Sequence, residues 1–186
     1  DAVGEINYFL DTSGLADNTM VFFLSDNGGA AYTGATENGP LKGGKLNHFE
    51  GGISIPMSIT LPGLVPEGQD YYMPVSSTDV FVTAAAAAGI ELPGDRDFDG
   101  VNLIPYLKGE SETVPHLSLH WRADHLHAMR RGPWKFIMSE RDGWVHLYNV
   151  EEDRAERFDL KDEKPLILDM MLEEHKLWEE DMSKPK

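Results

Sequence analysis

The sequence predicts an α/β fold that ends in a small antiparallel sheet, and two observations support this. Up to about residue 113, segments with apolar residues at helical spacing alternate with short apolar runs, an order typical of a parallel sheet covered by helices. Beyond that point, four short segments alternate apolar and polar residues, as antiparallel strands do, and one helical segment follows. We therefore expect a large α/β domain over residues 1–113 and a small C-terminal subdomain, four strands and a helix, over residues 114–186.

Helices and strands alternate in the first domain. Residues 1–13 carry apolar side chains at helical spacing, and Gly14 suits a helix C-terminus. The run TMVFFLS at 19–25 predicts a strand, and we expect it to form an αβ unit of a parallel sheet with the preceding helix. ISIPMSITLP at 53–62 predicts a second strand, and the run of alanines within 77–89 favours a helix.

The predicted strands of the subdomain are HLSLHWR, HAMRRG, WKFIMS and VHLYNV. The turn sequence RDG before Trp144 favours a hairpin between the last two. The final helix is expected to begin at Pro165, a residue that suits the first turn of a helix. The apolar residues expected to line this helix are Leu166, Met170, Leu172 and Leu177.

Composition narrows the functional classes. Hydrophobic residues make up 41% of the 186 residues, which is enough for a packed core. The chain has no cysteine, so disulfides, thiolate metal sites and a cysteine nucleophile are excluded within it. No apolar window is long enough to predict a membrane span. The net charge of −16 disfavours nucleic acid and anionic membranes as partners.

The charge is unevenly distributed along the chain. Residues 114–149 carry a net charge of +2, whereas the segments before and after them carry −12 and −6. An anionic substrate would therefore meet this basic segment, or the isolated Lys42 and Lys45.

Two polar residues with side-chain oxygens follow the first predicted strand. Asp26 and Asn27 come directly after an apolar run and are followed by Gly28 and Gly29. Ligands of open α/β sheets lie beyond the carboxyl ends of the strands, where these side chains could bind Ca²⁺ or Mg²⁺. An Asx turn that closes the strand is the alternative, and the sequence leaves it open.

The stretch GPLKGGKLNHFEGG, residues 39–52, is a candidate anion-binding loop. Its glycines leave backbone amides unhindered, and a lysine among them can hold phosphate or sulfate. It is not a Walker loop, because Leu46 rather than Ser or Thr follows Lys45. The alternative is a surface loop with solvated lysines.

Two other patterns suggest metal binding but favour simpler interpretations. DRDFDG at 95–100 resembles the start of an EF-hand loop, but Tyr106 stands where a bidentate Glu is required, which favours an acidic surface turn. A zinc cluster would use four histidines that lie on predicted strands. Histidines four residues apart bind one metal ion well on a helix but poorly on a strand. The four are His116, His120, His125 and His127.

Taken in order, these stretches resemble the sulfatase family of the alkaline phosphatase superfamily. The resemblance rests on TMVFFLSDNG, GPLKGGKLNHFEGG with ISIPMSITLPG, the helix from Asp79 to Gly89, DFDGVNLIPYLKG, and the late WKFI and HLYNVEEDRAE. It covers nearly the whole chain. It implies the C-terminal part of an alkaline-phosphatase-like α/β sandwich, followed by a small antiparallel sheet with a C-terminal helix.

The resemblance also implies roles for three residues. Asp26 and Asn27 would bind the divalent cation, usually Ca²⁺, although Mg²⁺ is an alternative. Lys45 would contact the sulfate and the leaving oxygen, as both a catalytic and a substrate-binding residue. The cation and the lysine would neutralise negative charge on the sulfate.

Other residues are expected to contact the substrate. His48 lies in the same loop as Lys45, and Trp121 with Arg122 lies in the basic segment. These residues suit a sulfated small molecule or saccharide, and a sulfated carbohydrate is the substrate we expect. Ordinary surface residues of a strand are the alternative for Trp121 and Arg122.

Several parts of the family's site are absent from this sequence. Members use a formylglycine made from Cys or Ser in a C/S-x-P-x-R motif, which does not occur here. We therefore expect a C-terminal fragment whose N-terminal portion carries the formylglycine and acts as its partner. The full-length enzyme would hydrolyse sulfate esters, whereas this chain alone is expected to be inactive. The resemblance implies a periplasmic or secreted location.

Two other functions stay open. A phosphatase or phosphonate hydrolase of the same superfamily would use a similar site, although the GGK…EGG loop favours a sulfatase. A non-catalytic binding module belongs to a different class. A sulfatase fragment, by contrast, predicts an exposed apolar sheet edge where missing strands would pair.

Overall fold

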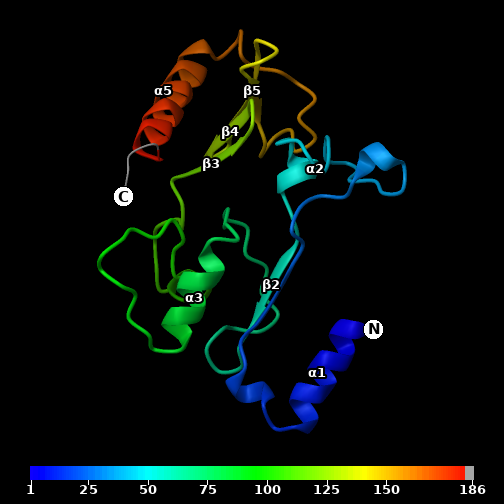
Figure 1. Ribbon diagram of the computed structural model, residues 1–186, viewed down its shortest axis with the longest axis vertical. Coiled ribbons are helices and arrows are strands. Elements are labelled where there is room, and N and C mark those ends of the chain that lie inside the picture. Colours follow the sequence, from blue (N-terminus) through cyan, green and yellow to red (C-terminus); the bar gives the residue numbers. More distant parts are fainter. Residues whose placement is uncertain (183–186) are drawn as a thin grey trace. The chain divides into compact units, whose positions relative to one another are not determined.

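The computed structural model describes residues 1–182, which form two compact units (Figure 1). One unit contains residues 1–24 and 57–116. The other contains residues 25–56, called the long loop below, together with residues 117–182. The long loop therefore belongs with the C-terminal sheet and not with the two strands that flank it.

The first unit carries the helices and strands predicted for the start of the chain. Its elements are α1 (Ala2–Thr12), the 3₁₀ turn η1 (Ala16–Asn18), β1 (Val21–Leu24), β2 (Met57–Thr60), α3 (Asp79–Ala87) and α4 (Ile104–Leu107). The predicted helices at the start of the chain and in the alanine run are confirmed.

Helix α1 leads into β1 in the predicted order, but the strand that pairs with β1 within residues 1–182 is not parallel to it. Strands β1 and β2 pair antiparallel, with Val21 opposite Thr60 and Leu24 opposite Met57. The physical reason is the connection between them. Two neighbouring parallel strands require a crossover that carries the chain back to the end of the sheet where the first strand began. The long loop makes no such crossover, and β2 begins at the end of the sheet where β1 stops.

The second unit is a meander that agrees with the sequence prediction. It contains the turn η2 (Ala31–Thr33), the short helix α2 (Glu50–Ile53), β3 (Ser118–Ala123), β4 (Leu126–Arg131), β5 (Trp134–Ser139), β6 (Trp144–Asn149) and α5 (Pro165–Met182). The four strands pair antiparallel in chain order. The hairpin predicted at RDG joins β5 to β6, and Gly143 adopts a positive φ of 70° there.

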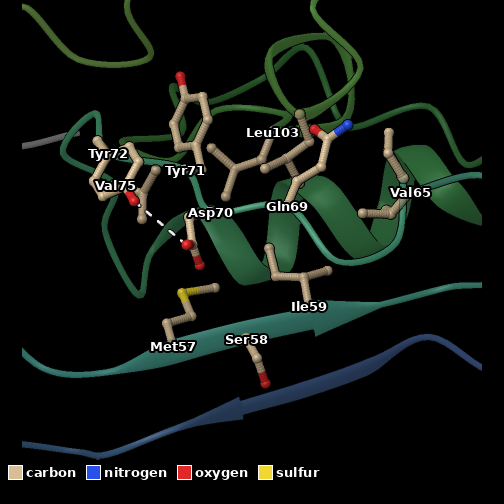
Figure 2. A pocket seen from close by; sticks show the side chains of 12 residues that line it. Met57, Ser58, Ile59, Val65, Gln69, Asp70, Tyr71, Tyr72, Val75 and Leu103 are labelled. Atoms are coloured by element: carbon tan, nitrogen blue, oxygen red, sulfur yellow. Dashed lines mark hydrogen bonds between the residues drawn. The ribbon is translucent and has the colours of Figure 1, made fainter.

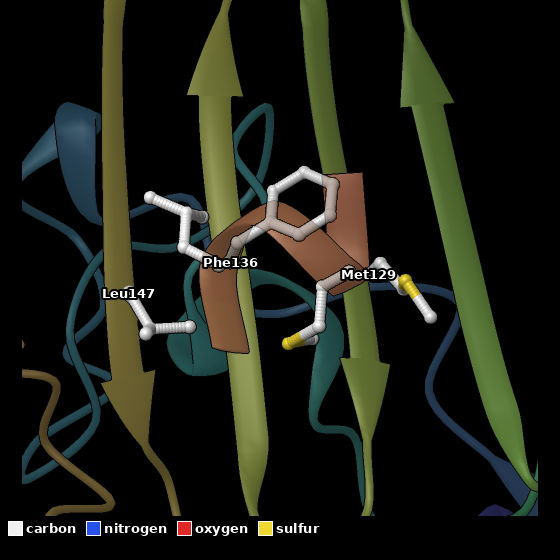
Figure 3. Close-up of a cluster of buried hydrophobic side chains, with 5 residues drawn as sticks. Met129, Phe136 and Leu147 are labelled. Carbon is white, nitrogen blue, oxygen red and sulfur yellow. The ribbon is translucent and has the colours of Figure 1, made fainter. Parts of the chain in front are cut away.

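The two faces of this sheet pack against different partners. Met129, Phe136 and Leu147 form one cluster, in which they meet Leu168 and Met171 of α5 (Figure 3). The next residues along these strands point the opposite way because side chains alternate. That face holds a second cluster of buried residues, formed by Ala128, Ile137, Tyr148 and Val150. Phe49 of the long loop packs against it, so the sheet lies between α5 and the long loop.

The apolar stripe expected for the final helix was only partly right. Leu172 packs against the core, but Leu166 is 82% exposed and Leu177 is 57% exposed. Leu168, Met171 and His175 are the buried residues of α5; Met170 is also exposed. Helix α5 carries apolar residues on more of its surface than the sheet can cover. The register in which α5 packs on the sheet therefore decides which of these residues are buried.

Candidate functional site

Backbone hydrogen bonds of the long loop bring the SDNG turn and the GGK stretch together. Gly28 N donates to Gly52 O over 2.9 Å, and Lys45 N donates to Gly29 O over 3.1 Å. The second bond places Lys45 beside Gly29, two positions after Asn27. These two bonds bring the segment with Asp26 and Asn27 close to Lys45.

The close approach of these backbones requires glycine. A Cβ atom on Gly28 would lie 1.7 Å from Gly51 O, well inside van der Waals contact. Asn38 adds a side-chain bridge, because its Oδ1 accepts from Gly29 N over 2.8 Å and its Nδ2 donates to Gly29 O and Gly43 O. The glycines and Asn38 therefore fix the path of the loop.

Asp26 and Asn27 form a turn and still leave oxygens available. Asp26 Oδ1 accepts from Asn27 N over 2.9 Å, and Asn27 Nδ2 donates to Gly28 O over 2.9 Å. An Asx turn does not form, because Asp26 Oδ1 accepts from the next residue and Gly28 N donates to Gly52 O. Asp26 Oδ2 and Asn27 Oδ1 have no donor within residues 1–182. Two such oxygens fit a Ca²⁺ or Mg²⁺ ion, although Ca²⁺ takes roughly six to eight oxygen ligands and needs others besides these.

The two loop lysines have different surroundings. Lys42 Nζ donates to Tyr148 Oη over 3.3 Å and to Glu156 O over 3.2 Å, and it lies 4.3 Å from the ring centre of Phe49. Lys45 is exposed, and its ammonium group contacts no acceptor in the part of the chain that the structure describes. Lys42 therefore fastens the loop to the sheet, whereas Lys45 is available to an anion.

A buried ion-pair network anchors the long loop. Lys135 of β5 is 0% exposed, and its Nζ lies 2.8 Å from Glu50 Oε1 and 2.9 Å from Glu156 Oε1. Glu50 N also donates to Glu156 Oε2 over 2.7 Å. Burial raises the pKa of the Glu156 carboxyl, and the positive charge of Lys135 opposes this shift. Sequence reasoning missed the network, although a lysine inside the apolar run WKFIMS was a signal for it.

His48 lies inside the same unit rather than on its surface. It is 7% exposed, and its Nδ1 has no hydrogen-bond partner among residues 1–182. Burial, with a contribution from the charge of Lys135, lowers the pKa of His48 to about 4. The imidazole is therefore neutral at pH 7.

Trp121 and Arg122 do not face the same way. Trp121 packs with the cluster that Phe49 also contacts, on the loop side of the sheet. Arg122 is the next residue on β3 and points to the α5 side, where its Nη1 lies 3.3 Å from Glu179 Oε1. The structure thus brings Trp121, but not Arg122, to the face that carries the loop.

The histidines expected on the strands do not form one cluster. His116 belongs to the first unit, where its Nε2 lies 2.9 Å from both carboxylate oxygens of Asp79. His125 pairs with the neighbouring Asp124 over 2.7 Å. His127 contacts α5 instead, and the histidine it meets there was not identified from the sequence.

The first unit has a pocket of about 510 Å³ whose lining is mainly apolar (Figure 2). Met57, Tyr71 and Leu103 line it, and Tyr72 Oη donates to Asp70 Oδ2 over 3.3 Å at its edge. Among the described residues, no lysine, arginine or histidine lines this pocket. It is therefore poorly suited to a sulfate or phosphate group.

Comparisons with known proteins point to one family. The family model for sulfatases matches residues 1–90. Human steryl-sulfatase is 39% identical over 142 residues, and mouse N-acetylgalactosamine-6-sulfatase is 38% identical over 139 residues. These matches cover 71% and 73% of this chain but only 24% and 26% of the two relatives. The chain thus spans about a quarter of the length of these curated relatives.

Structural similarity leads to the same family. A crystal structure described as Ps i-CgsB in complex with k-i-k-neocarrahexaose matches with a TM-score of 0.83 at 31% identity, over 95% of this chain and 40% of that one. The fold is therefore of the alkaline-phosphatase-like α/β type. The chain belongs to the sulfatase family and forms a C-terminal part of the sulfatase fold. Within residues 1–182, no helix is long and apolar enough to cross a membrane.

Proposed function

We propose that this chain supplies the cation-binding and sulfate-binding residues of a sulfatase, an enzyme that hydrolyses sulfate esters. Asp26 and Asn27 would hold a divalent cation, Ca²⁺ or Mg²⁺, and Lys45 would hold the sulfate. The observation that carries this proposal is the bond from Lys45 N to Gly29 O, which keeps a lysine with no acidic partner among residues 1–182 beside the Asn27 turn. The positive charges of the cation and of Lys45 would stabilise the sulfate and the leaving oxygen.

The remaining chemistry would come from outside this chain. A formylglycine on the N-terminal portion would supply the nucleophile. The residues of this chain would bind and orient the ester: Lys45 would contact sulfate oxygens, and His48, in the same loop, would contact the substrate. This chain alone is then expected to give no turnover.

The exposed apolar surface of the first unit supports an N-terminal partner. No residue of α1 is buried, and Ile6 and Phe9 on this helix are 58% and 61% exposed. Phe23 of β1 is 53% exposed, in a sheet that has only two strands within residues 1–182. Further strands and helices of the same enzyme would cover this surface, because exposed apolar sheet edges favour pairing.

A sulfated carbohydrate is the substrate class we propose. The structural relative with 31% identity is described in complex with a saccharide, and one sequence relative is an N-acetylgalactosamine-6-sulfatase. Trp121 lies on the loop side of the sheet, where its ring could pack on a sugar. The relative named steryl-sulfatase makes a steroid sulfate the second candidate. The location implied by the resemblance, the periplasm or the outside of the cell, is part of this proposal.

The test begins with the native preparation that contains this chain. Intact-mass spectrometry under conditions that keep partners attached should reveal a formylglycine-bearing portion. Aryl-sulfate hydrolysis should then fall about 10²–10³-fold in kcat/KM when Lys45→Ala removes one charge at the sulfate. Lys164→Ala, which removes an exposed lysine elsewhere in the same unit, is the matched control. Removal of Ca²⁺ should abolish turnover, and Asp26→Ala should do the same.

Each alternative gives a different result. Faster hydrolysis of an aryl phosphate than of an aryl sulfate would favour a phosphatase. Absence of turnover in a preparation shown to carry the formylglycine would favour a binding module. Equal activity of Lys45→Ala and Lys164→Ala would refute the role given to Lys45. Competition between a sulfated oligosaccharide and a steroid sulfate would decide the substrate class.

A further inference from the structure

Three potential metal ligands converge between β4 and α5, on the face of the sheet opposite the long loop. His127 lies on β4, and His175 and Glu179 lie one turn apart on α5. The two histidines are 1% and 3% exposed, and the Glu179 side chain is 24% exposed. Within residues 1–182, no other three His, Asp or Glu side chains place their ligand atoms within 4.8 Å of one another.

The spacing of these atoms matches a tetrahedral metal site. His127 Nδ1 lies 3.2 Å from His175 Nε2 and 3.1 Å from Glu179 Oε1. Around a tetrahedral zinc ion with bonds of about 2.0–2.1 Å, neighbouring ligand atoms lie about 3.3 Å apart. Two of the three separations are therefore close to those that one ion would require, and all three atoms lie within 4.8 Å of one another.

The outer nitrogen of His175 has the kind of partner that a metal-bound imidazole needs, and the outer nitrogen of His127 lies near a carboxylate without a hydrogen bond to it. With His127 Nδ1 on a metal, its ring proton is on Nε2, which lies 3.4 Å from Glu140 Oε2. His175 Nδ1 can donate to His120 Nδ1 over 3.0 Å, and His120 Nε2 can donate to Ser118 Oγ over 3.2 Å. The protons on His175 Nδ1 and His120 Nε2 then each have an acceptor.

Without a metal ion, the tautomer of a neutral His127 with its proton on Nδ1 fits its surroundings poorly. Its Nδ1 faces both an imidazole nitrogen and a carboxylate oxygen, so a proton there would be shared between two acceptors. Its Nε2 would then be a lone pair directed at the Glu140 carboxylate, and it has no hydrogen-bond partner within the described part of the chain. With the proton on Nε2 instead, His175 Nε2 can donate to His127 Nδ1, but the Glu179 carboxylate then faces the same lone pair over 3.1 Å; a cation bound at Nδ1 would attract both groups.

We propose that His127, His175 and Glu179 bind one Zn²⁺ ion, or a similar divalent transition-metal ion, with water as the fourth ligand. Two ring nitrogens and one carboxylate oxygen favour Zn²⁺ over Ca²⁺, which prefers oxygen ligands. Arg122 also contacts the Glu179 carboxylate and would orient it. The ion would fasten α5 to the sheet, so this site is separate from the cation site proposed at Asp26.

The test uses the untagged chain, because an oligohistidine tag would itself bind zinc. The chain is stripped with a chelator and titrated with Zn²⁺ in competition with a chromophoric chelator. We expect one equivalent to bind, the thermal midpoint of unfolding to rise, and Co²⁺ in place of Zn²⁺ to give the intense visible absorption of a tetrahedral site. Glu179→Gln should weaken Zn²⁺ binding at least about 10-fold.

Two matched variants show whether zinc binds at Glu179 rather than elsewhere on the chain. Glu173→Gln makes the same charge change at an exposed position of the same helix and should leave zinc affinity unchanged. Asp26→Asn should also leave it unchanged, because that residue lies in the other proposed cation site. Stoichiometric zinc binding that is equally strong in Glu179→Gln, or a weak octahedral Co²⁺ spectrum, would overturn the proposal. So would the absence of zinc binding by the folded wild-type chain.

Discussion

Replacing Lys135 with methionine should destabilise the C-terminal unit more than any replacement of a surface lysine. Lys135 is fully buried and lies within 2.9 Å of carboxylates from both Glu50 and Glu156. Methionine has a similar volume, so the change leaves almost no cavity. What it does leave is two buried carboxylates side by side with no positive charge between them.

The magnitude follows from this arrangement. Removing one partner of a buried ion pair costs about 3–5 kcal/mol, because the other charge stays buried and unpaired. The variant can reduce this cost by binding a proton, since like charges and burial raise the pKa of a carboxyl group. A carboxyl group whose pKa is raised on folding stabilises the fold at low pH and loses that contribution as the pH rises. The loss caused by Lys135→Met should therefore be larger at pH 8 than at pH 5.

Urea unfolding of the wild-type chain and of Lys135→Met, at pH 5 and at pH 8, measures this loss of stability. Lys161→Met is the control, because Lys161 lies at the surface and its pair with Asp159 is worth about 1 kcal/mol or less. A variant in which Lys135→Met is combined with Glu50→Gln and Glu156→Gln should recover part of the stability. The reasoning is refuted if Lys135→Met costs less than about 1 kcal/mol, or if its cost does not depend on pH.

Two further predictions concern the long loop. Gly28→Ala should lower the free energy of unfolding by about 1–3 kcal/mol in urea, because its Cβ would lie 1.7 Å from Gly51 O. Gly4→Ala, in a helix with open space around it, should cause no loss, and equal effects of the two changes would contradict the clash. His48 has a pKa of about 4 in the folded chain against 6.5 as its ordinary value, so it binds more protons when unfolded, and stability should fall as the pH drops from 6.5 towards 4. Thermal melts over this range should show a smaller decline for His48→Gln, and an identical decline would exclude His48 as its source.

The local elements could be predicted from the sequence because short-range patterns decide them. The four antiparallel strands, the hairpin at RDG and the final helix follow from alternation, a turn sequence and helical spacing. The antiparallel pairing of the first two strands was not predicted. Whether neighbouring strands run parallel or antiparallel depends on the path of the connection, and a loop rich in glycine gives no periodic signal for that path.

The sequence was enough to predict the residue types of the candidate site. It was not enough to predict the buried contacts that hold the loop in place. Asp26, Asn27 and Lys45 stand out because oxygen ligands and a lysine occur among glycines after an apolar run. Their roles in a sulfatase remain predictions. The anchor formed by Lys135, which sequence reasoning missed, joins residues that are far apart in the chain, and no local pattern records such contacts.

The sequence by itself determined the family, the elements and the chemistry that the long loop can offer, because these depend on residue types at short spacing. Only the tertiary structure decided that the long loop packs on the C-terminal sheet, that Lys42 is engaged while Lys45 is available, and that His127 meets His175 and Glu179. These outcomes depend on which distant side chains become neighbours when the sheet buries both of its faces. A buried charge or ring nitrogen must then find its partner in space rather than in sequence.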